Sequence, residues 1–261
     1  MSFSISKKAW SKFISDLRKV DAAATQSIQY YLQEFGFPQS REALEDLIYA
    51  AFSISNRFGE AAAALSAEWY DAMAALSGVT VPGALPAPPA TMSDVASAIM
   101  GTIDSENKEL VSGAISRLVK LQGVDTTLQN AIRDGAEVAW IPSGDTCAYC
   151  IELASRGWRP ASKRQLKNGH AEHVHANCDC SFAVRFDKKS DVAGYADGED
   201  AKIILENSPL NEGEADTRKN RLNAVRRRLY AENREKILAQ KRSAYEKSKE
   251  LESSAAEEMD I

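Results

Sequence analysis

Apolar residues recur every three or four positions along the first 35 residues, which is the spacing of one buried stripe on an α-helix. The stripe consists of Ile5, Trp10, Phe13, Ile14, Leu17, Val20, Ala24, Ile28 and Tyr31. Gly36 and Pro38 follow it, and these residue types close a helix and prevent its continuation. The sequence therefore predicts a first helix over residues 5–35.

A second, alanine-rich helix is predicted from about residue 40 to residue 76, with candidate interruptions at Asn56 and Gly59. The next fourteen residues, 77–90, contain four prolines and two glycines. Such a segment forms neither a helix nor a central strand. We therefore expect a linker here.

Helical spacing returns after the proline-rich segment. Ser93 is the predicted N-cap of a third helix that continues to Ile103, and the periodicity resumes from Leu110 until Gly123. One more short helix is predicted over 126–139. The first 140 residues are thus expected to be all-α.

The pattern changes after Trp140. A helical turn is predicted over 151–155, a strand over 181–186 and a long basic helix over 217–250. The predicted fold class is mainly α: a helical N-terminal region, a small α+β region that contains the cysteines and histidines, and a long basic C-terminal helix. The predicted divisions are an N-terminal helical region (1–78), a Pro-rich linker (79–92), a region with the Cys/His knuckle (93–198) and a basic helical C-terminal arm (199–261).

Composition excludes some classes of protein. The chain has 261 residues, 44% of them hydrophobic, and no apolar run approaches the roughly 20 residues that a membrane span needs. The first residues mix Ser and Lys with apolar residues and lack the cleavage pattern of a secretory signal. We therefore expect an intracellular protein without a membrane partner.

Cysteine and histidine are confined to one segment. The chain has four cysteines and three histidines, and all seven lie between Cys147 and Cys180. Because nothing indicates secretion, a metal site is a better explanation than a disulfide framework. Zinc takes four N or S ligands, commonly two from a C-x-x-C knuckle and two from a distant pair. We therefore predict structural Zn²⁺ as the cofactor, with reduced buried thiols as the alternative.

The candidates outnumber the four ligand positions. The predicted ligands, in order of preference, are Cys147 and Cys150, then Cys178 and His175, then Cys180. His173 and His170 follow last; with Glu172 they are either exposed loop residues or general acids and bases beside the metal. Trp158, between the two ligand pairs, is expected to pack over the metal, with base stacking as the alternative.

Net charge is −5, but residues 218–250 contain twelve Lys or Arg and four Glu, a local charge of +8. Such a helix can contact phosphates, or it can be a solvated surface helix. The candidate nucleic-acid-binding residues are Arg226, Arg227, Arg228, Lys241 and Arg242.

The cysteine segment resembles a known family. Residues 140–150, 154–158 and 175–180 are similar to the C-x-x-C…H-x-N-C-x-C signature of the phage Mu F-like minor head proteins, the head-morphogenesis family of tailed phages and prophages. Many members have His-Pro-Asn-Cys-Arg-Cys, where this chain has Ala176 and Asp179 in place of the Pro and Arg. The candidate ligands are unchanged by these two differences.

The resemblance implies a structural minor capsid protein of the virion, present in the host cytoplasm during assembly. Its implied partners are portal and capsid proteins and, through the basic arm, phage DNA during packaging or ejection. It implies no catalytic residue, no enzyme activity and no small-molecule substrate. Two alternatives remain: a metal-dependent phage endonuclease with His173 or His175 as general base, and a zinc-containing DNA-binding module. No histidine follows Cys180, which weakens the nuclease hypothesis.

Overall fold

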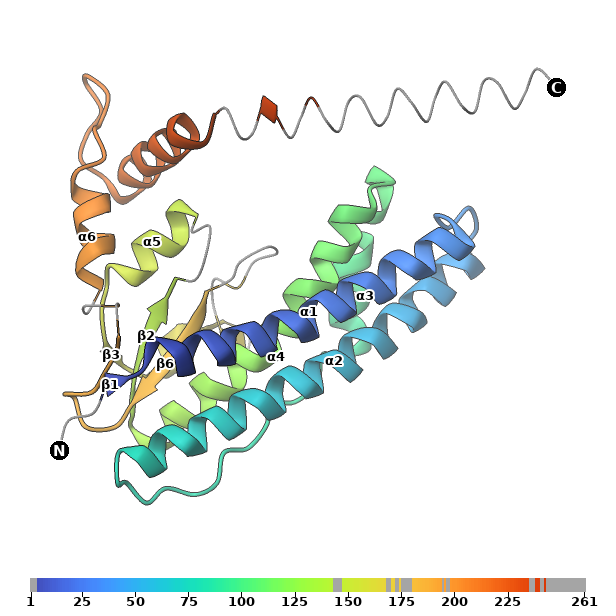
Figure 1. The fold of residues 1–261 in the computed structure, drawn as a ribbon. Helices are drawn as coiled ribbons and strands as arrows, with labels where there is room; N and C mark the ends of the chain where they lie inside the picture. The colour runs from blue at the N-terminus through green and yellow to red at the C-terminus, as the bar shows by residue number, and fades with distance from the viewer. Residues whose placement is uncertain are drawn as a thin grey trace.

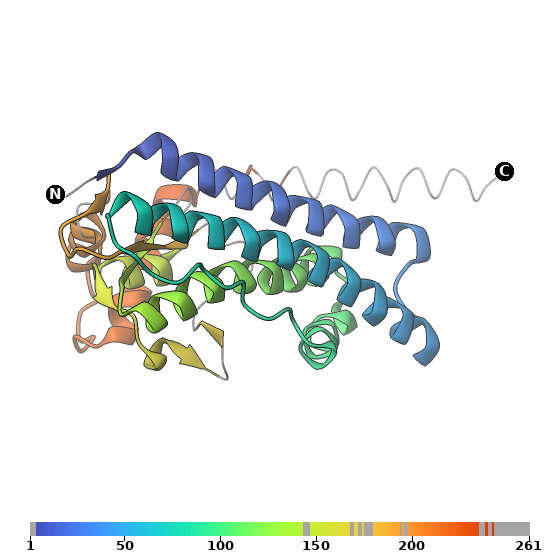
Figure 2. The ribbon, with the colours of Figure 1, turned by 90° about the horizontal axis from the view of Figure 1, so that it is seen from below.

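Three long helices run side by side and form the body of the protein (Figures 1 and 2). They are α1 (Lys7–Phe35), α2 (Arg41–Leu76) and α4 (Lys108–Asp134). The computed structural model describes residues 4–142, 147–167, 170–171, 174, 180–193, 195, 198–234, 238–239 and 242. The predicted fold class is confirmed, since a small β region follows the helical bundle and a C-terminal helix follows the β region.

Local side chains set the ends of α1 and α2. Ser6 and Ser40 each accept, at 3.1 Å, the backbone N–H of the third residue of the helix that follows them. Gly36 ends α1 with a φ of 73°, as the sequence predicts. The predicted interruptions of the second helix at Asn56 and Gly59 are wrong, because α2 is continuous through both.

Small residues let α2 and α4 approach each other closely. A Cβ atom added to Gly59 of α2 would lie 1.9 Å from Oε1 of Gln122 on α4. A Cβ atom on Gly123 of α4 would lie 3.0 Å from Oγ of Ser66 and 3.3 Å from the carbonyl oxygen of Ala62, both on α2. Glycine costs a helix about 1 kcal/mol relative to alanine. At these two positions it makes room for the facing helix, and neither glycine ends its own helix.

The proline-rich segment lies along α4. Residues 79–91 form neither helix nor strand, as predicted, but side chains of α4 bind their backbone. Asn130 accepts the N–H of Leu85 at 3.0 Å and donates to its carbonyl oxygen at 2.8 Å. Thr126 Oγ1 accepts the N–H of Ala87 at 2.9 Å. We call residues 79–91 the strap, because this expected linker is fastened to the bundle by buried polar side chains.

Helix α3 (Met92–Met100) begins two residues earlier than predicted. Thr91, and not Ser93, is the N-cap: its Oγ1 accepts the N–H of Asp94 at 3.2 Å, and Asp94 Oδ2 accepts the N–H of Thr91 at 2.9 Å. This reciprocal pair is a capping box. A 3₁₀ turn, η1 (Ile103–Ser105), then leads to α4.

The end of α4 differs from the prediction. The helix continues through Gly123 and closes at Gly135, whose φ is 67°. The predicted helix over 126–139 is therefore wrong: its first part belongs to α4, and its last residues belong to the strand β2 (Glu137–Ile141). A short apolar run does not distinguish a buried strand from a helix, and the pairing of β2 inside a sheet decides the outcome here.

A three-stranded antiparallel sheet, in the order β3-β2-β6, lies against one end of the bundle (Figure 1). Strand β6 (Ser181–Arg185) confirms the strand predicted over 181–186. The remaining short strands are β1 (Ser4–Ile5), β3 (Arg159–Pro160), β4 (Leu166–Lys167), β5 (His170–Ala171) and β7 (Asp191–Val192); β1 pairs with β7 and β4 with β5. The remaining helical segments are α5 (Ala148–Ala154), η2 (Lys163–Gln165), α6 (Glu199–Glu206) and a helix over 218–234.

One hydrophobic core joins the bundle, the sheet and the C-terminal helix. Its buried members include Trp10, Tyr70, Leu128, Val184 and Val225, which come from five different elements. A second core fills the opposite end of the bundle. The predicted boundary between 1–78 and 93–198 therefore crosses a shared core. Of the helices that the structure describes, none is both long enough and apolar enough to cross a membrane.

Candidate metal centre

The C-x-x-C pair lies at the start of α5. Cys147 is the N-cap of this helix, and its Sγ accepts the backbone N–H of Cys150 at 3.4 Å. Cys150 is buried, and Cys147 is partly exposed. The first half of the predicted site thus has the local geometry of a knuckle.

Strand pairing places Cys180, the described residue of the second half of the site, at the edge of the sheet that also leads to Cys147. Ile141, the last residue of β2, pairs with Ser181, the first residue of β6. Cys147 follows the end of β2 in the sequence, and Cys180 directly precedes the start of β6. Both connections therefore begin at the same edge of the sheet. This register places Cys147 and Cys180, thirty-three positions apart in the sequence, on the connections at one edge of the sheet.

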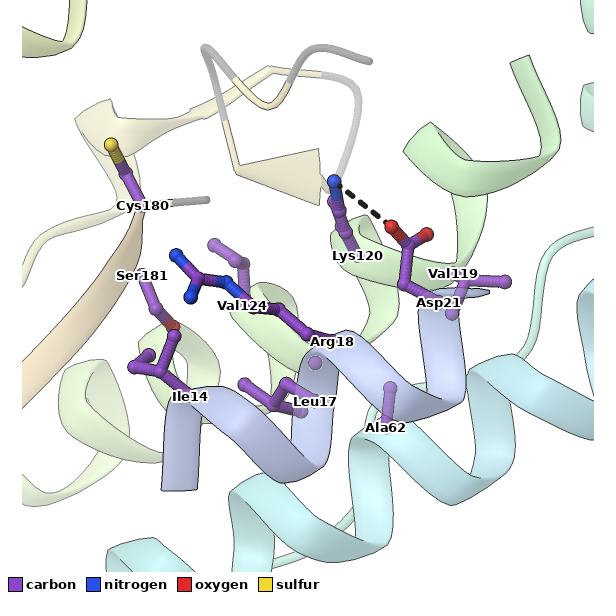
Figure 3. Close-up of a pocket in the computed structure, with 11 residues that line it drawn as sticks. Ile14, Leu17, Arg18, Asp21, Ala62, Val119, Lys120, Val124, Cys180 and Ser181 are labelled. Carbon is purple, nitrogen blue, oxygen red and sulfur yellow. Dashed lines mark ion pairs between the residues drawn. The ribbon is translucent and has the colours of Figure 1, made fainter. Parts of the chain in front are cut away.

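Cys180 also borders a groove between α1 and α4 (Figure 3). The walls of the groove are mostly apolar, with an ion pair of 3.1 Å between Lys120 of α4 and Asp21 of α1. Figure 3 shows the sulfur of Cys180 pointing away from Ile14 and Leu17, the apolar α1 side chains of the groove. The sulfur is therefore directed out of the apolar part of the groove.

Two of the five predicted ligands, His175 and Cys178, lie outside the described residues, as do Glu172 and His173. Within the described ranges, no group of three or more His, Cys, Asp or Glu side chains is arranged to hold a metal ion. The described residues with donors that zinc accepts are Cys147, Cys150 and Cys180, through their thiolates, and His170, through its imidazole.

His170, the least favoured candidate ligand, contacts a buried carboxylate. Its Nδ1 lies 2.7 Å from Oδ2 of Asp125 on α4, and Oδ1 of Asp125 accepts the N–H of Ala171. Burial raises the pKa of Asp125, while the hydrogen bonds from His170 and Ala171 act in the opposite direction. Asp125 did not emerge from the sequence analysis. The sequence signal that could have identified Asp125 is a charged residue on the helix face that also carries the apolar residues Val124 and Leu128.

Trp158 is buried, and its surroundings are protein side chains. Its Nε1 donates to Oδ1 of Asp191 at 3.0 Å, its ring meets the ring of Tyr195 edge to face, and the guanidinium of Arg185 lies 4.6 Å from its centroid. A base-stacking role requires an open ring face. The burial of Trp158 therefore argues against that role.

The basic arm is partly neutralised by acidic side chains. Arg227 bonds Glu214 at 2.8 Å, Arg228 bonds Glu232 at 2.7 Å, and Arg226 donates to Asn223. Of the other two candidate nucleic-acid-binding residues, Arg242 is exposed on a helical position, and Lys241 lies outside the described residues. Arginines already paired with carboxylates contribute less to phosphate binding than the sequence count suggests.

The first part of the C-terminal helix is docked on α5. Ala224 and Val225 are buried, and Arg218 bonds Glu152 of α5 at 3.0 Å. Arg156 bonds the same carboxylate at 2.7 Å. The knuckle helix and the arm are therefore joined through Glu152, a residue that the sequence analysis did not single out.

Comparison with known proteins places most of the chain in one family. The model of a family described as VG15 protein matches residues 4–202. The chain belongs to the VG15 protein family. The matched region runs from β1 into α6, so it includes the bundle, the sheet and both cysteine pairs, and the C-terminal helix lies beyond it. No curated protein and no solved structure matches the chain significantly.

Docking of the arm should depend on the charge of Glu152. Burial opposes ionisation of Glu152, but hydrogen bonds from Arg218 and Arg156 outweigh it and hold its pKa below the ordinary 4.5. A lowered pKa gives stability that is present above pH 4.5 and is lost as pH falls through the lower folded-state value. We expect Glu152→Gln to speed amide hydrogen exchange over 218–229 about fivefold at pH 7, since an exposed partner limits the loss to about 1 kcal/mol.

The same measurement in acid provides the check. Wild-type exchange over 218–229, corrected for the intrinsic rate, should approach that of Glu152→Gln below pH 4.5. Glu199→Gln removes a more exposed ion pair with Lys202 and serves as the matched control. Equal exchange in wild type and Glu152→Gln at pH 7 would show that Glu152 does not hold the arm.

Proposed function

We propose that the protein is a structural minor capsid protein of a tailed phage or prophage, which associates with the portal or the inner capsid during head assembly. The main support is the combination of a helical bundle with a C-x-x-C pair at the start of α5 and with Cys180 directly before β6, at the edge of the sheet where β2 ends and β6 begins. The order of these parts agrees with the Mu F-like arrangement that the cysteine motif resembles. The role is assembly, and it requires no reaction and no small-molecule substrate.

In this proposal, zinc is a structural cofactor. Cys147 and Cys150 hold it from the start of α5, and two of His175, Cys178 and Cys180 complete the four ligands. When bound, the ion crosslinks the loop before α5 to the loop before β6, and four protein ligands leave no open position for water. Such crosslinking is valuable here because the strands on either side have only two to five residues.

We also propose that the C-terminal arm contacts phage DNA. The docked part, up to residue 229, has several arginines that are already bound to carboxylates. The free positive charge is therefore expected mainly beyond residue 229, where Arg234, Lys236, Lys241 and Arg242 follow. Binding through such charges weakens steeply with salt.

The assembly role predicts that the protein is part of the particle. Mass spectrometry of particles purified from a host that carries the gene should detect the chain at a fixed, low copy number relative to the major capsid protein. Crosslinking should connect it to the portal. Absence from intact particles, or release of the whole population by a mild salt wash, would contradict the proposed function.

Zinc is expected at one ion per chain, measured by elemental analysis of the purified protein. Cys147→Ser should abolish retention of the ion and unfold the region around α5 and β6, because the loss of one ligand leaves an incomplete site. Ala148→Ser changes a buried neighbour in the same helix and should retain the metal. A metal-free native protein whose thiols all react at once, or whose cysteines form disulfides, would rule the site out.

Removal of residues 230–261 should weaken DNA binding about tenfold or more at low salt and reduce the salt dependence of the affinity. The docked part of the helix remains, so the core around Val225 stays covered. Replacement of Arg227 and Arg228 by Gln, as a control, should have a smaller effect, because both already bond carboxylates. Unchanged affinity after truncation would place the contact elsewhere, and DNA cleavage with Mg²⁺ would favour the nuclease alternative.

A further inference from the structure

Helix α4 holds both sides of the segment that carries the second set of predicted ligands. That segment follows β5 and leads into β6, and it includes His175, Cys178 and Cys180. The described residues of this part of the chain are His170, Ala171, Val174 and Cys180. Each of the four lies against α4 or against the groove that α4 lines.

The first attachment is Asp125. Only 2% of this residue is exposed, although an aspartate is rarely buried without partners. One carboxylate oxygen bonds the ring of His170, and the other bonds the backbone N–H of Ala171. A single side chain thus fixes both the ring and the main chain of β5. A carboxylate bound on both oxygens is a rigid anchor, because hydrogen bonds to a charged group are stronger than neutral ones.

The second attachment is Arg117. Its Nε donates to the carbonyl oxygen of Val174 at 2.9 Å, and the side chain of Val174 is buried. The third is the start of β6, where Cys180 and Ser181 line the groove beside Lys120 and Val124. The chain is therefore held at Val174 and again at Cys180, on either side of His175 and Cys178.

The attachment points lie at different positions along α4. Arg117 and Asp125 are eight residues apart, which is about 12 Å along α4. The described residues contact α4 at different levels: His170 at Asp125, Val174 at Arg117, and Cys180 and Ser181 near Lys120 and Val124. Helix α4 is itself fixed by α2 and the strap, so it is a rigid support for this path.

We propose that Asp125 and Arg117 are positioning residues of the zinc site: they hold the ligand-bearing segment on α4 in the shape in which it binds the ion. The inference rests on the proposed zinc site. A segment fixed at both sides loses less conformational entropy when it binds metal, and this raises affinity without adding a ligand. Loss of such supporting groups typically costs 10–100-fold in metal affinity.

The experiment measures zinc affinity of the full-length protein by competition with a chromophoric chelator. Asp125→Asn and Arg117→Ala should each weaken zinc binding about tenfold or more. Arg117→Lys retains a donor and should recover part of the loss. Arg117 is exposed, so its variants keep the test valid even if the Asp125 variant folds poorly.

Thr126→Val is the matched control. Thr126 is buried on the same helix, one residue from Asp125, but it bonds the strap and not the ligand segment. It should lower the melting temperature while its zinc affinity stays within about twofold of wild type. Co²⁺ in place of zinc gives a second readout, because the thiolate-to-metal absorption band reports the ligand set. This band should keep its shape in Asp125→Asn and Arg117→Ala while the Co²⁺ affinity falls.

The measurements distinguish failure of the positioning role from failure of the proposed zinc site. Zinc affinity within about twofold of wild type in both Asp125→Asn and Arg117→Ala would overturn the positioning role and leave the zinc site intact. A changed cobalt spectrum in Asp125→Asn would also overturn it, because Asp125 or His170 would then belong to the ligand set. A wild-type protein that binds neither Zn²⁺ nor Co²⁺ would overturn the proposed zinc site and this inference together.

Discussion

The pairing of β2 with β6 is the interaction on which the candidate metal centre depends. Its register places the end of one strand opposite the start of the other, so the connections that carry Cys147 and Cys180 begin at the same edge of the sheet. The strands are short, but their residues are almost all buried against the bundle, so packing stabilises a sheet that would be marginal alone. A shift of this register by one residue would separate Ile141 from Ser181 and misalign the two strand ends.

Buried charge in this protein occurs where separate segments must be joined. Asp125 joins β5 to α4, and Glu152 joins the C-terminal helix to α5. In both cases the carboxylate has two partners, which offsets the cost of removing it from water. Carboxylates also pair with arginines at the surface of the arm, where Glu214 bonds Arg227 and Glu232 bonds Arg228. Electrostatic contacts therefore add to the apolar packing that attaches β5 and the C-terminal helix.

Much of the helical architecture could be predicted from local signals. The apolar stripe, the closing glycine and the capping serines of α1 and α2 lie within a few residues of the features that they determine. The strand β6 was also predictable from its alternating pattern. The predicted helix over 126–139 failed because the fate of Val138 to Ile141 is decided by β6, about forty residues away. Gly59 appeared to be a helix breaker because the helix facing it is not visible in a local window.

The candidate site was predictable only in part. Clustering of cysteine and histidine identifies the segment, and the C-x-x-C spacing identifies the knuckle. The sequence gives no sign that Asp125 meets His170, since the contact spans 45 positions and depends on how β5 lies on α4. The neutralisation of Arg227 by Glu214 likewise depends on a turn between two helices that a count of charges does not reveal.

The strap limits where residues can be inserted into this chain. Its composition suggests a spacer that tolerates insertions, yet Asn130 and Thr126 bond individual backbone groups at Leu85 and Ala87. An added residue between those positions would leave at least one buried amide or hydroxyl without its partner. Fluorophores and affinity tags are better attached at an exposed position in the turn after Phe35, such as Gln39, and not at Gly36, whose φ of 73° other residues rarely adopt.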